Sequence, residues 1–523
     1  MKLIMRKIYL LLSLIGLSLA SVASAQNSSV VRQAEIEMNL SRSLWFNSSN
    51  VAGMSIAPLS RYSIVDFGYQ RKNGDFKMSQ QGEKESVVGF NTNGSATVGK
   101  TYLWGNFDYK NIVEDGTKYI TNLYDPSREM PYYVADGVES KFKKQSYDLG
   151  VKAAFPQLWG FVTPGCELQY NTNTGAKQRD PRSVTYFLTV KAAPSFLFEL
   201  SEKHHVGFVV NYEYLYERST FNRSDTEIDY PVYIMRGLGN YTSGVVSGSV
   251  GVGTFFYKGN KIGGSIQYGY NSGKGEAAVL DAGYSYKVED AFQTPTKKQT
   301  MGSTKQNAWF VDLQLVDENA NIMDKTQITY KERYTDGIEY IQELDQSFDV
   351  AEWITLAKYV RSKYVYRELD MNFEYYLKSD NSYKWMFGAY FNHSYKFDEY
   401  LLPAASFKAE NDYTELVAKR NFIFDSGNSS LLAGLNLGYN ENVKGDYQYT
   451  GAYSDSETVT DMYKNDIMFL SSDYLTVGGE ATYSTLVSKS TSLFVKGAVK
   501  YYAPFDNDFK NRIYTNISFG ITF

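Results

Sequence analysis

The last residues of the chain, 513–523, read Ile-Tyr-Thr-Asn-Ile-Ser-Phe-Gly-Ile-Thr-Phe. Successive side chains of a β-strand point to opposite faces. One face would therefore carry Ile513, Thr515, Ile517, Phe519, Ile521 and Phe523, and the other Tyr514, Asn516, Ser518, Gly520 and Thr522. The alternation predicts a strand that separates an apolar environment from a polar one.

The same period of two recurs upstream, in residues 206–217, 383–396 and 431–440. The alternating segments are about 10 to 18 residues long, whereas strands of soluble proteins centre on five or six. Tilted membrane-spanning strands need about 9 to 11 residues, and their apolar faces end in aromatic girdles. In residues 383–396 the predicted lipid side carries Tyr383, Trp385, Phe387, Phe391 and His393. We therefore predict an all-β fold, a closed antiparallel transmembrane β-barrel.

The composition excludes the main alternatives to a barrel. The 523 residues include 46 Tyr, 31 Phe and 6 Trp, but only 11 Pro. A disordered chain lacks aromatic residues at this level, and no linkers that would separate small domains are visible. The mean hydropathy of -0.38 is too polar for a bundle of membrane helices, each of which needs an apolar run of about 20 residues.

The first 25 residues have the pattern of a secretory signal peptide. Lys2, Arg6 and Lys7 precede an apolar run, and Ala23 and Ala25 form a small-x-small cleavage site. Without these three bases, 50 basic residues (53 minus 3) face 58 acidic ones, a net charge of about -8 that argues against a nucleic acid partner. The predicted divisions are a signal peptide over 1–25, a periplasmic or luminal plug-like segment over 26–60, and the barrel over 61–523.

Bacterial barrels alternate short periplasmic turns with long external loops, so turn signals indicate the number of strands. We predict long loops at residues 113–141, 219–248, 316–360 and 451–466, and short turns at 93–95, 156–160, 201–204, 258–261, 378–382, 425–429 and 488–491, with 290–305 as an extended eighth turn. With both chain ends in the periplasm, eight such turns imply about 18 strands. Loss of one or two weak hairpins, such as Asn73-Gly74-Asp75, would give 16 or 14.

The C-terminal residues Phe519, Ile521 and Phe523 resemble the signal that the outer-membrane barrel assembly machinery reads on the last strand. We therefore expect this machinery as a partner during biogenesis. A barrel in the outer membrane of a Gram-negative bacterium is also expected to contact outer-membrane lipid and lipopolysaccharide.

Two segments carry a resemblance to a known family: Leu44-Trp45-Phe46-Asn47-Ser48-Ser49-Asn50-Val51-Ala52-Gly53-Met54 and Leu103-Trp104-Gly105-Asn106-Phe107-Asp108-Tyr109. Together with the length and the tyrosine-rich hairpins, they resemble the Bacteroidota outer-membrane barrels of the domain-of-unknown-function 6850 family. The resemblance covers essentially the whole mature chain. It implies the barrel fold and brings no established activity.

Residues 50–54 are also distantly similar to the Asn-Pro-Ala-Gly/Ala-Leu segment of the long-chain fatty acid transporter superfamily, where an N-terminal segment plugs the lumen. Val51 stands where that motif has proline, so the backbone is less constrained here. The similarity implies a plug that includes Trp45, Phe46, Asn50, Ala52 and Gly53.

The sequence leaves two functions open. The predicted luminal positions carry Asn, Glu, Lys, Gly and Ser, which favours a channel or transporter for a small solute. The alternative is a non-transporting scaffold or accessory subunit of a secretion or surface nutrient-uptake system, placed beside a surface receptor. Such a subunit would present external loops, among them the acidic one with Asp455, Glu457 and Asp461.

Two further classes are not expected. An outer-membrane hydrolase needs a general base such as His, and the three histidines, His204, His205 and His393, are not placed for catalysis at an external rim. Because adjacent strand residues point to opposite faces, His204 and His205 do not form a metal site, and no cofactor is predicted. A TonB-dependent receptor resembles a barrel of 22 strands with a separate plug domain, for which the mature chain is too short.

Overall fold

A closed ring of antiparallel strands forms the body of the computed structural model, which describes residues 32–123, 125, 128–247, 252–294, 298–347, 352–505 and 508–523. Within these ranges, eighteen strands each pair with the next barrel strand along the chain, and the first pairs with the last. The barrel strands are β1 (Tyr62–Gly74), β2 (Lys84–Val98), β3 (Thr101–Thr117), β5 (Ser140–Ala154), β6 (Val162–Lys177), β7 (Arg182–Ser201), β8 (His204–Asn222), β11 (Thr254–Asn271), β12 (Glu276–Thr294), β13 (Gln299–Glu318), β14 (Ile322–Asp345), β15 (Glu352–Ser379), β16 (Ser382–Leu401), β17 (Ala404–Phe424), β18 (Ser429–Tyr449), β19 (Tyr474–Ser488), β20 (Thr491–Pro504) and β21 (Arg512–Thr522).

The seam between β1 and β21 closes the barrel. Its register runs from Ile64 opposite Thr522 to Gly74 opposite Arg512. At its lower end the Ser63 amide donates to the Phe523 carbonyl (3.1 Å) and the Phe523 amide donates to the Ser63 carbonyl (2.9 Å). Hydrocarbon offers no partner to a free backbone N–H or C=O, so a β-sheet can cross a membrane only when it is closed. The predicted 18-strand antiparallel barrel is confirmed.

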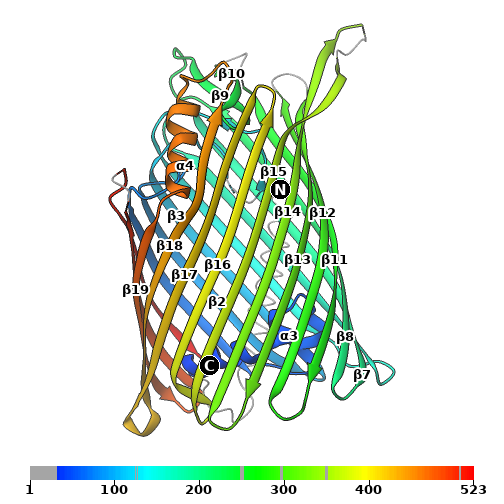
Figure 1. Ribbon diagram of the computed structural model, residues 1–523, viewed down its shortest axis with the longest axis vertical. Helices are drawn as coiled ribbons and strands as arrows, with labels where there is room; N and C mark the ends of the chain where they lie inside the picture. The colour runs from blue at the N-terminus through cyan, green and yellow to red at the C-terminus, as the bar shows by residue number, and fades with distance from the viewer. Residues whose placement is uncertain are drawn as a thin grey trace.

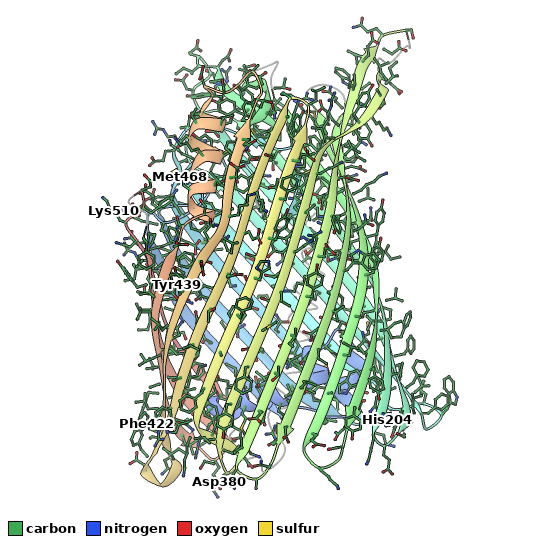
Figure 2. The ribbon with its side chains drawn as sticks, in the orientation of Figure 1. His204, Asp380, Phe422, Tyr439, Met468 and Lys510 are labelled. Atoms are coloured by element: carbon green, nitrogen blue, oxygen red, sulfur yellow. The ribbon has the colours of Figure 1, made fainter. Side chains whose placement is uncertain are left out.

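Apolar side chains face outward and polar ones face inward, as the period of two predicts. Leu435 is 73% exposed and Phe519 63% exposed on the outer surface, whereas the inward-facing Glu217 and Gln267 are fully buried. Side chains such as Phe422 near the lower rim (Figure 2) contribute aromatic rings to this outer surface. An outer surface of this kind suits hydrocarbon and not water. The protein is an outer-membrane barrel.

Eight short turns join the described strands at the lower end of Figure 1. Short turns mark the periplasmic side of a bacterial barrel, so the opposite end, with the longer connections, faces outward. The short turns are residues 99–100, 155–161, 202–203, 272–275, 319–321, 380–381, 425–428 and 489–490.

Two predicted turns are wrong because they lie inside strands. Residues 93–95 belong to β2 and residues 258–261 belong to β11. The Asn93-Gly94 pair has the composition of a tight turn. In the structure, however, the Asn93 side-chain amide donates to the Asn91 side-chain oxygen within the lumen (3.0 Å). A Cβ atom at Gly94 would lie 2.6 Å from the Tyr62 carbonyl oxygen. This glycine therefore permits close approach of two strands and does not reverse the chain.

Two further predictions are wrong, but together they leave the strand count unchanged, because one predicted periplasmic turn is external and one real periplasmic turn was missed. The extended turn predicted over 290–305 lies at the external end, where β12 and β13 meet, and the long loop predicted over 316–360 contains the periplasmic turn 319–321 and all of β14. β12, β13 and β14 are about 20 residues long and carry enough polar residues to have the composition of loops. The other three predicted long loops do contain external connections.

A bulge at the start of β16 also reverses one predicted face. Lys378 pairs with Tyr383 while its neighbour Leu377 pairs with Trp385, so Lys384 has no partner in the register. A bulge adds one residue, so the side chains before it and after it no longer follow one alternation. Tyr383 is therefore fully buried inside the barrel and donates to Glu37 (3.1 Å), and its predicted place on the lipid face is wrong.

Short helices and a small sheet occupy the two ends of the barrel (Figure 1). Near the periplasmic end lie α2 (Gln33–Arg42), α3 (Leu44–Asn47) and the 3₁₀ turn η1 (Val51–Ser55), and η3 (Asp425–Gly427) forms one turn. At the external end, β4 (Val134–Ala135), β9 (Tyr230–Gly237) and β10 (Asn240–Val246) form a second sheet, next to η4 (Thr458–Tyr463) and α4 (Lys464–Leu470). None of the described helices is long and apolar enough to span a membrane.

Replacing Leu435 by Arg should destabilise the folded barrel in lipid by about 2–4 kcal/mol, because the substitution places a charge on the lipid face. The free energy of unfolding from phospholipid bilayers measures this change. Leu435→Ala is the control for loss of the side chain without a charge. Equal effects of Arg and Ala would show that this face is not in contact with hydrocarbon.

Candidate functional site: a lumen closed at both ends

Asn50 fixes the N-terminal segment to the inner wall. It is fully buried, and its side-chain amide donates to the Phe196 carbonyl on β7 (3.0 Å) and to Gln267 on β11 (2.9 Å). Its side-chain oxygen accepts from the Ala52 amide (3.0 Å), which caps η1. Beside it, the Ser49 amide donates to Asp281 on β12 (2.8 Å). The short segment around Asn50 thus forms hydrogen bonds with three barrel strands, β7, β11 and β12.

Three glycines on the wall make room for this segment. A Cβ atom at Gly207 on β8 would collide with the Asn50 amide, and one at Gly269 on β11 would collide with the Trp45 ring. A Cβ atom at Gly165 on β6 would lie 2.6 Å from the Ala52 nitrogen. Glycine permits such close approach because it has no side chain. Parity along residues 206–217 could have indicated one of these glycines, because Gly207 falls on the predicted luminal face of its strand.

Side chains of α2 reach further strands of the ring. Glu37 accepts from Lys419 on β17 (2.7 Å), Ser41 donates to Glu374 on β15, and Arg42 pairs with Glu318 on β13 (3.3 Å). Gln33 donates to Thr522 on β21 (3.0 Å). The N-terminal segment is therefore attached to strands around the ring and lies across the periplasmic end of the lumen.

The predicted plug residues lie together in this segment. Trp45, Asn50, Ala52 and Gly53 are buried, and Phe46 packs edge-on against Trp104 at 5.4 Å between ring centroids. The predicted cleavage site at Ala23 and Ala25 lies outside the described residues. Phe519 and Phe523 face outward on or next to β21 and Ile521 lies between them, while recognition of these residues by the assembly machinery stays a prediction.

At the external end, Arg128 anchors the long connection between β3 and β5 to the inner wall. Its guanidinium donates to Glu289 on β12 (2.7 Å) and to Glu217 on β8, and it lies 4.8 Å from the centroid of the Tyr257 ring. Lys287 pairs with Glu289 (3.3 Å). Arg128 is 7% exposed and both carboxylates are fully buried. Removing one partner of such a cluster leaves an uncompensated buried charge, which costs several kcal/mol.

Further polar contacts join the external loops to one another and to the barrel wall. Tyr119 donates to Asp461 (2.6 Å), Tyr233 donates to Glu457 (2.7 Å), and Lys177 forms a buried pair with Asp136 (2.5 Å). Two of the acidic residues singled out in the sequence, Glu457 and Asp461, thus bind this chain's own loops. We call the connections 75–83, 118–139, 223–253 and 450–473, so far as the structure describes them, the lid.

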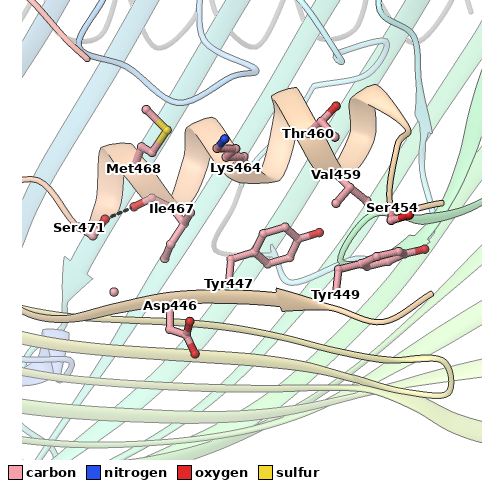
Figure 3. Close-up of a pocket in the computed structure, with 11 residues that line it drawn as sticks. Asp446, Tyr447, Tyr449, Ser454, Val459, Thr460, Lys464, Ile467, Met468 and Ser471 are labelled. Atoms are coloured by element: carbon pink, nitrogen blue, oxygen red, sulfur yellow. Dashed lines mark hydrogen bonds between the residues drawn. The ribbon is translucent and has the colours of Figure 1, made fainter. Parts of the chain in front are cut away.

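An open cleft of about 530 Å³ separates α4 from the upper part of β18 (Figure 3). Tyr447 and Tyr449 line it from the strand, and Val459, Ile467 and Met468 line it from the helical segment. In the described register, β18 pairs with β19 only as far as Asn440. The helix α4 therefore covers the part of β18 that no longer pairs with β19, and the cleft remains between the helix and the strand.

The side chains of the adjacent His204 and His205 differ in exposure, and His393 lies on another strand, β16. The His204 ring lies at the lower rim (Figure 2) with Nδ1 2.7 Å from the Tyr268 hydroxyl, whereas His205 is buried. His393 Nδ1 lies 2.6 Å from Asp412 on the neighbouring strand, a pair that the sequence analysis missed. In the part of the chain that the structure describes, no group of three or more His, Cys, Asp or Glu side chains could hold a metal ion.

Bulk at the glycines should displace the N-terminal segment. We expect Gly207→Val combined with Gly269→Leu to raise the labelling rate of a Val51→Cys reporter at least about tenfold, because Asn50 and Trp45 lose their places on the wall. A charged maleimide reports the rate in a Cys166→Ser background. Gly89→Val is the control, since its Cβ would meet only the Tyr109 carbonyl at 3.7 Å. Unchanged labelling in the double variant would contradict the fit.

The lid should loosen as the pH rises. Burial raises the pKa of Asp466 on α4 to about 6, against the lowering effects of the Ser79 amide, which donates to it (2.7 Å), and of Lys396 and Lys77. Because the pKa in the folded lid is above that of the free side chain, the stabilisation is full below about pH 4 and is lost as the pH rises through 6.

Hydrogen exchange of residues 76–83, corrected for intrinsic rates, measures this loosening. Between pH 5 and pH 7 their protection should fall by roughly tenfold, and Asp466→Asn should remove the dependence. A fall of the same size in the Asn variant would assign the effect to another group.

Comparison with known proteins gives a family but no activity. No protein of curated function matches the sequence. Solved structures with a related arrangement include the ferric preacinetobactin receptor BauA of Acinetobacter baumannii (9% identity, TM-score 0.38, covering 88% of this chain and 80% of that one). They also include the outer membrane transporter YddB of Escherichia coli (8%, 0.39, 88% and 81%) and FpvA of Pseudomonas aeruginosa in complex with a pyoverdine (10%, 0.40, 88% and 71%).

These TM-scores are too low to transfer a property from any of the three proteins. The model of a family of unknown function, DUF6850, matches residues 51–523, which include the whole barrel. The match confirms the family resemblance; it includes the Trp104 segment and, of the segment 44–54, residues 51–54. The chain belongs to this DUF6850 family of unknown function.

Proposed function

We propose that the protein is an outer-membrane transporter for a small polar solute, in which residues 32–60 form a removable plug and the external loops form a lid. The observation that carries the proposal is the attachment of Asn50 and its neighbours. They bind the wall by hydrogen bonds and by fit to three glycines. A segment held in this way can leave the wall, because water replaces each hydrogen bond when the lumen is hydrated.

The apolar residues of the plug favour a polar solute over a fatty acid. Met38, Leu44 and Trp45 belong to one buried cluster with Tyr376, Tyr383 and Leu432 of the barrel wall. Ile36, Val51 and Met54 belong to another with Tyr62 and Tyr102. These side chains are covered by the wall, so they do not line a free apolar path.

The alternative, a non-transporting scaffold or accessory subunit, is favoured by one feature. The end of β14 after Glu339 and the start of β15 before Ser362 pair only with each other. They project as a hairpin past the external rim (Figure 1). This hairpin exposes Ile341, Ile354, Leu356 and Tyr359. Exposed apolar side chains on a loop that faces outward suit contact with another surface protein.

Conductance in planar bilayers distinguishes the two functions. The Ser49 and Ser265 hydroxyl oxygens are 2.7 Å apart, so cysteines at both positions can form a disulfide that locks the plug. In a variant that also carries Cys166→Ser and Arg128→Ala, which loosens the lid, we expect single-channel steps after reduction and at least about tenfold fewer after oxidation, because the locked plug closes the lumen.

The variant with Ser49→Cys alone is the matched control and should respond to neither treatment. Absence of steps from the reduced double-cysteine protein, together with no uptake of small solutes by liposomes that contain it, would reject transport in favour of the scaffold.

A further inference from the structure

Four tyrosine rings form a continuous arc on the luminal wall. Tyr390 on β16, Tyr413 on β17, Tyr474 on β19 and Tyr502 on β20 follow one another with ring centroids 6.2, 6.3 and 6.2 Å apart. Each ring is half-buried. The residue before Tyr502 on β20, Tyr501, is 39% exposed on the outer surface. The arc therefore presents aromatic surface to the lumen, separately from the tyrosines of the lipid face.

The charges around the arc are paired. Lys500 binds Glu415 (2.5 Å), and Lys331 binds Glu368 (3.0 Å) and Asp370 (3.2 Å). Asp370 also accepts from the Tyr390 hydroxyl (2.7 Å). Together these groups carry two positive and three negative charges, so the arc has no positive surplus and does not favour an anion. They do leave both donors and acceptors at its edge.

Another part of the wall, on β2, β3, β5 and β6, carries a ladder of amides and carboxylates. Asn91 donates to Asp108 (2.5 Å), Asn106 donates to Asp148 (3.1 Å), and Asn171 donates to Asp148 (3.2 Å). Gly150 leaves the space that the Asn106 side chain occupies. The ladder is short of apolar atoms and rich in groups that bind hydroxyls.

We propose that the lumen binds a neutral carbohydrate, with the tyrosine arc stacking on sugar rings and the polar ladder binding hydroxyls. A sugar ring has an apolar C–H face that fits an aromatic face, and each hydroxyl both donates and accepts. A fatty acid would leave the ladder unsatisfied, and a small inorganic ion would make no use of the rings. This inference rests on the proposed transport function and names the class of its solute.

Binding by titration calorimetry tests the site without requiring conductance. The full-length protein, in a detergent without a sugar headgroup, is titrated with maltohexaose, cellohexaose and xylohexaose, and with hexagalacturonate as the acidic counterpart. The Gly207→Val, Gly269→Leu variant is titrated in parallel, since we expect its periplasmic entrance to be open. We expect at least one neutral hexasaccharide to bind, and to bind more tightly than hexagalacturonate.

The variants assign the binding to the arc. Tyr474→Ala with Tyr502→Ala should weaken binding at least about tenfold, the effect of losing two stacked rings, whereas Phe at both positions should retain it within about threefold. Tyr501→Ala, on the opposite face of β20, is the matched control and should bind like the unmodified protein.

Two results would overturn the proposal: no neutral hexasaccharide binding to either protein, or binding that is insensitive to the Ala substitutions. If the reduced cysteine variant still conducts, either result rejects the carbohydrate and leaves the channel. Binding without conductance would support the site and reject transport.

Discussion

Closure of the sheet between β1 and β21 is the constraint on which the rest of the molecule depends. The last residue, Phe523, exchanges two backbone hydrogen bonds with Ser63, and without them the edges of the first and last strands would face lipid unpaired. An unpaired backbone group in hydrocarbon costs several kcal/mol. Closure in turn produces an enclosed interior with polar walls. That interior would be an open pore unless other segments of the chain entered it, as the N-terminal segment and the external loops do.

The features of the fold that depend on near neighbours in sequence could be predicted. The alternation in residues 513–523 shows which side chains face lipid, and the short turns at 201–204 and 488–491 coincide with real chain reversals. Predictions failed where a local signal had a non-local cause. Gly94 resembles a turn residue, yet it is required by the approach of the Tyr62 carbonyl. Tyr383 matches the lipid face by counting, yet the bulge at Lys384 turns it inward toward Glu37.

The lumen could be predicted less well, because its contacts join residues far apart in the chain. Asn50 belongs to a motif that resemblance singled out, but its partners Phe196 and Gln267 are 146 and 217 residues away. Arg128 lies in a predicted loop, and no local pattern indicates that it binds Glu217 and Glu289. Parity does identify which residues face inward. Which of them meet is decided by the stagger of eighteen strands, and an error of one residue in any strand changes the answer.

The closure by the N-terminal segment and the closure by the lid differ in the interactions that hold them. The N-terminal segment is held by hydrogen bonds, one of which ends on the Asp281 carboxylate, by buried apolar contacts with the wall, and by ion pairs of α2 that are partly exposed to water. The lid is held by Arg128 between two fully buried carboxylates, and separating such a cluster costs several kcal/mol unless all its members are hydrated together. Because buried charges hold the lid and apolar contacts contribute to holding the N-terminal segment, we expect a change of charge to act on the lid first.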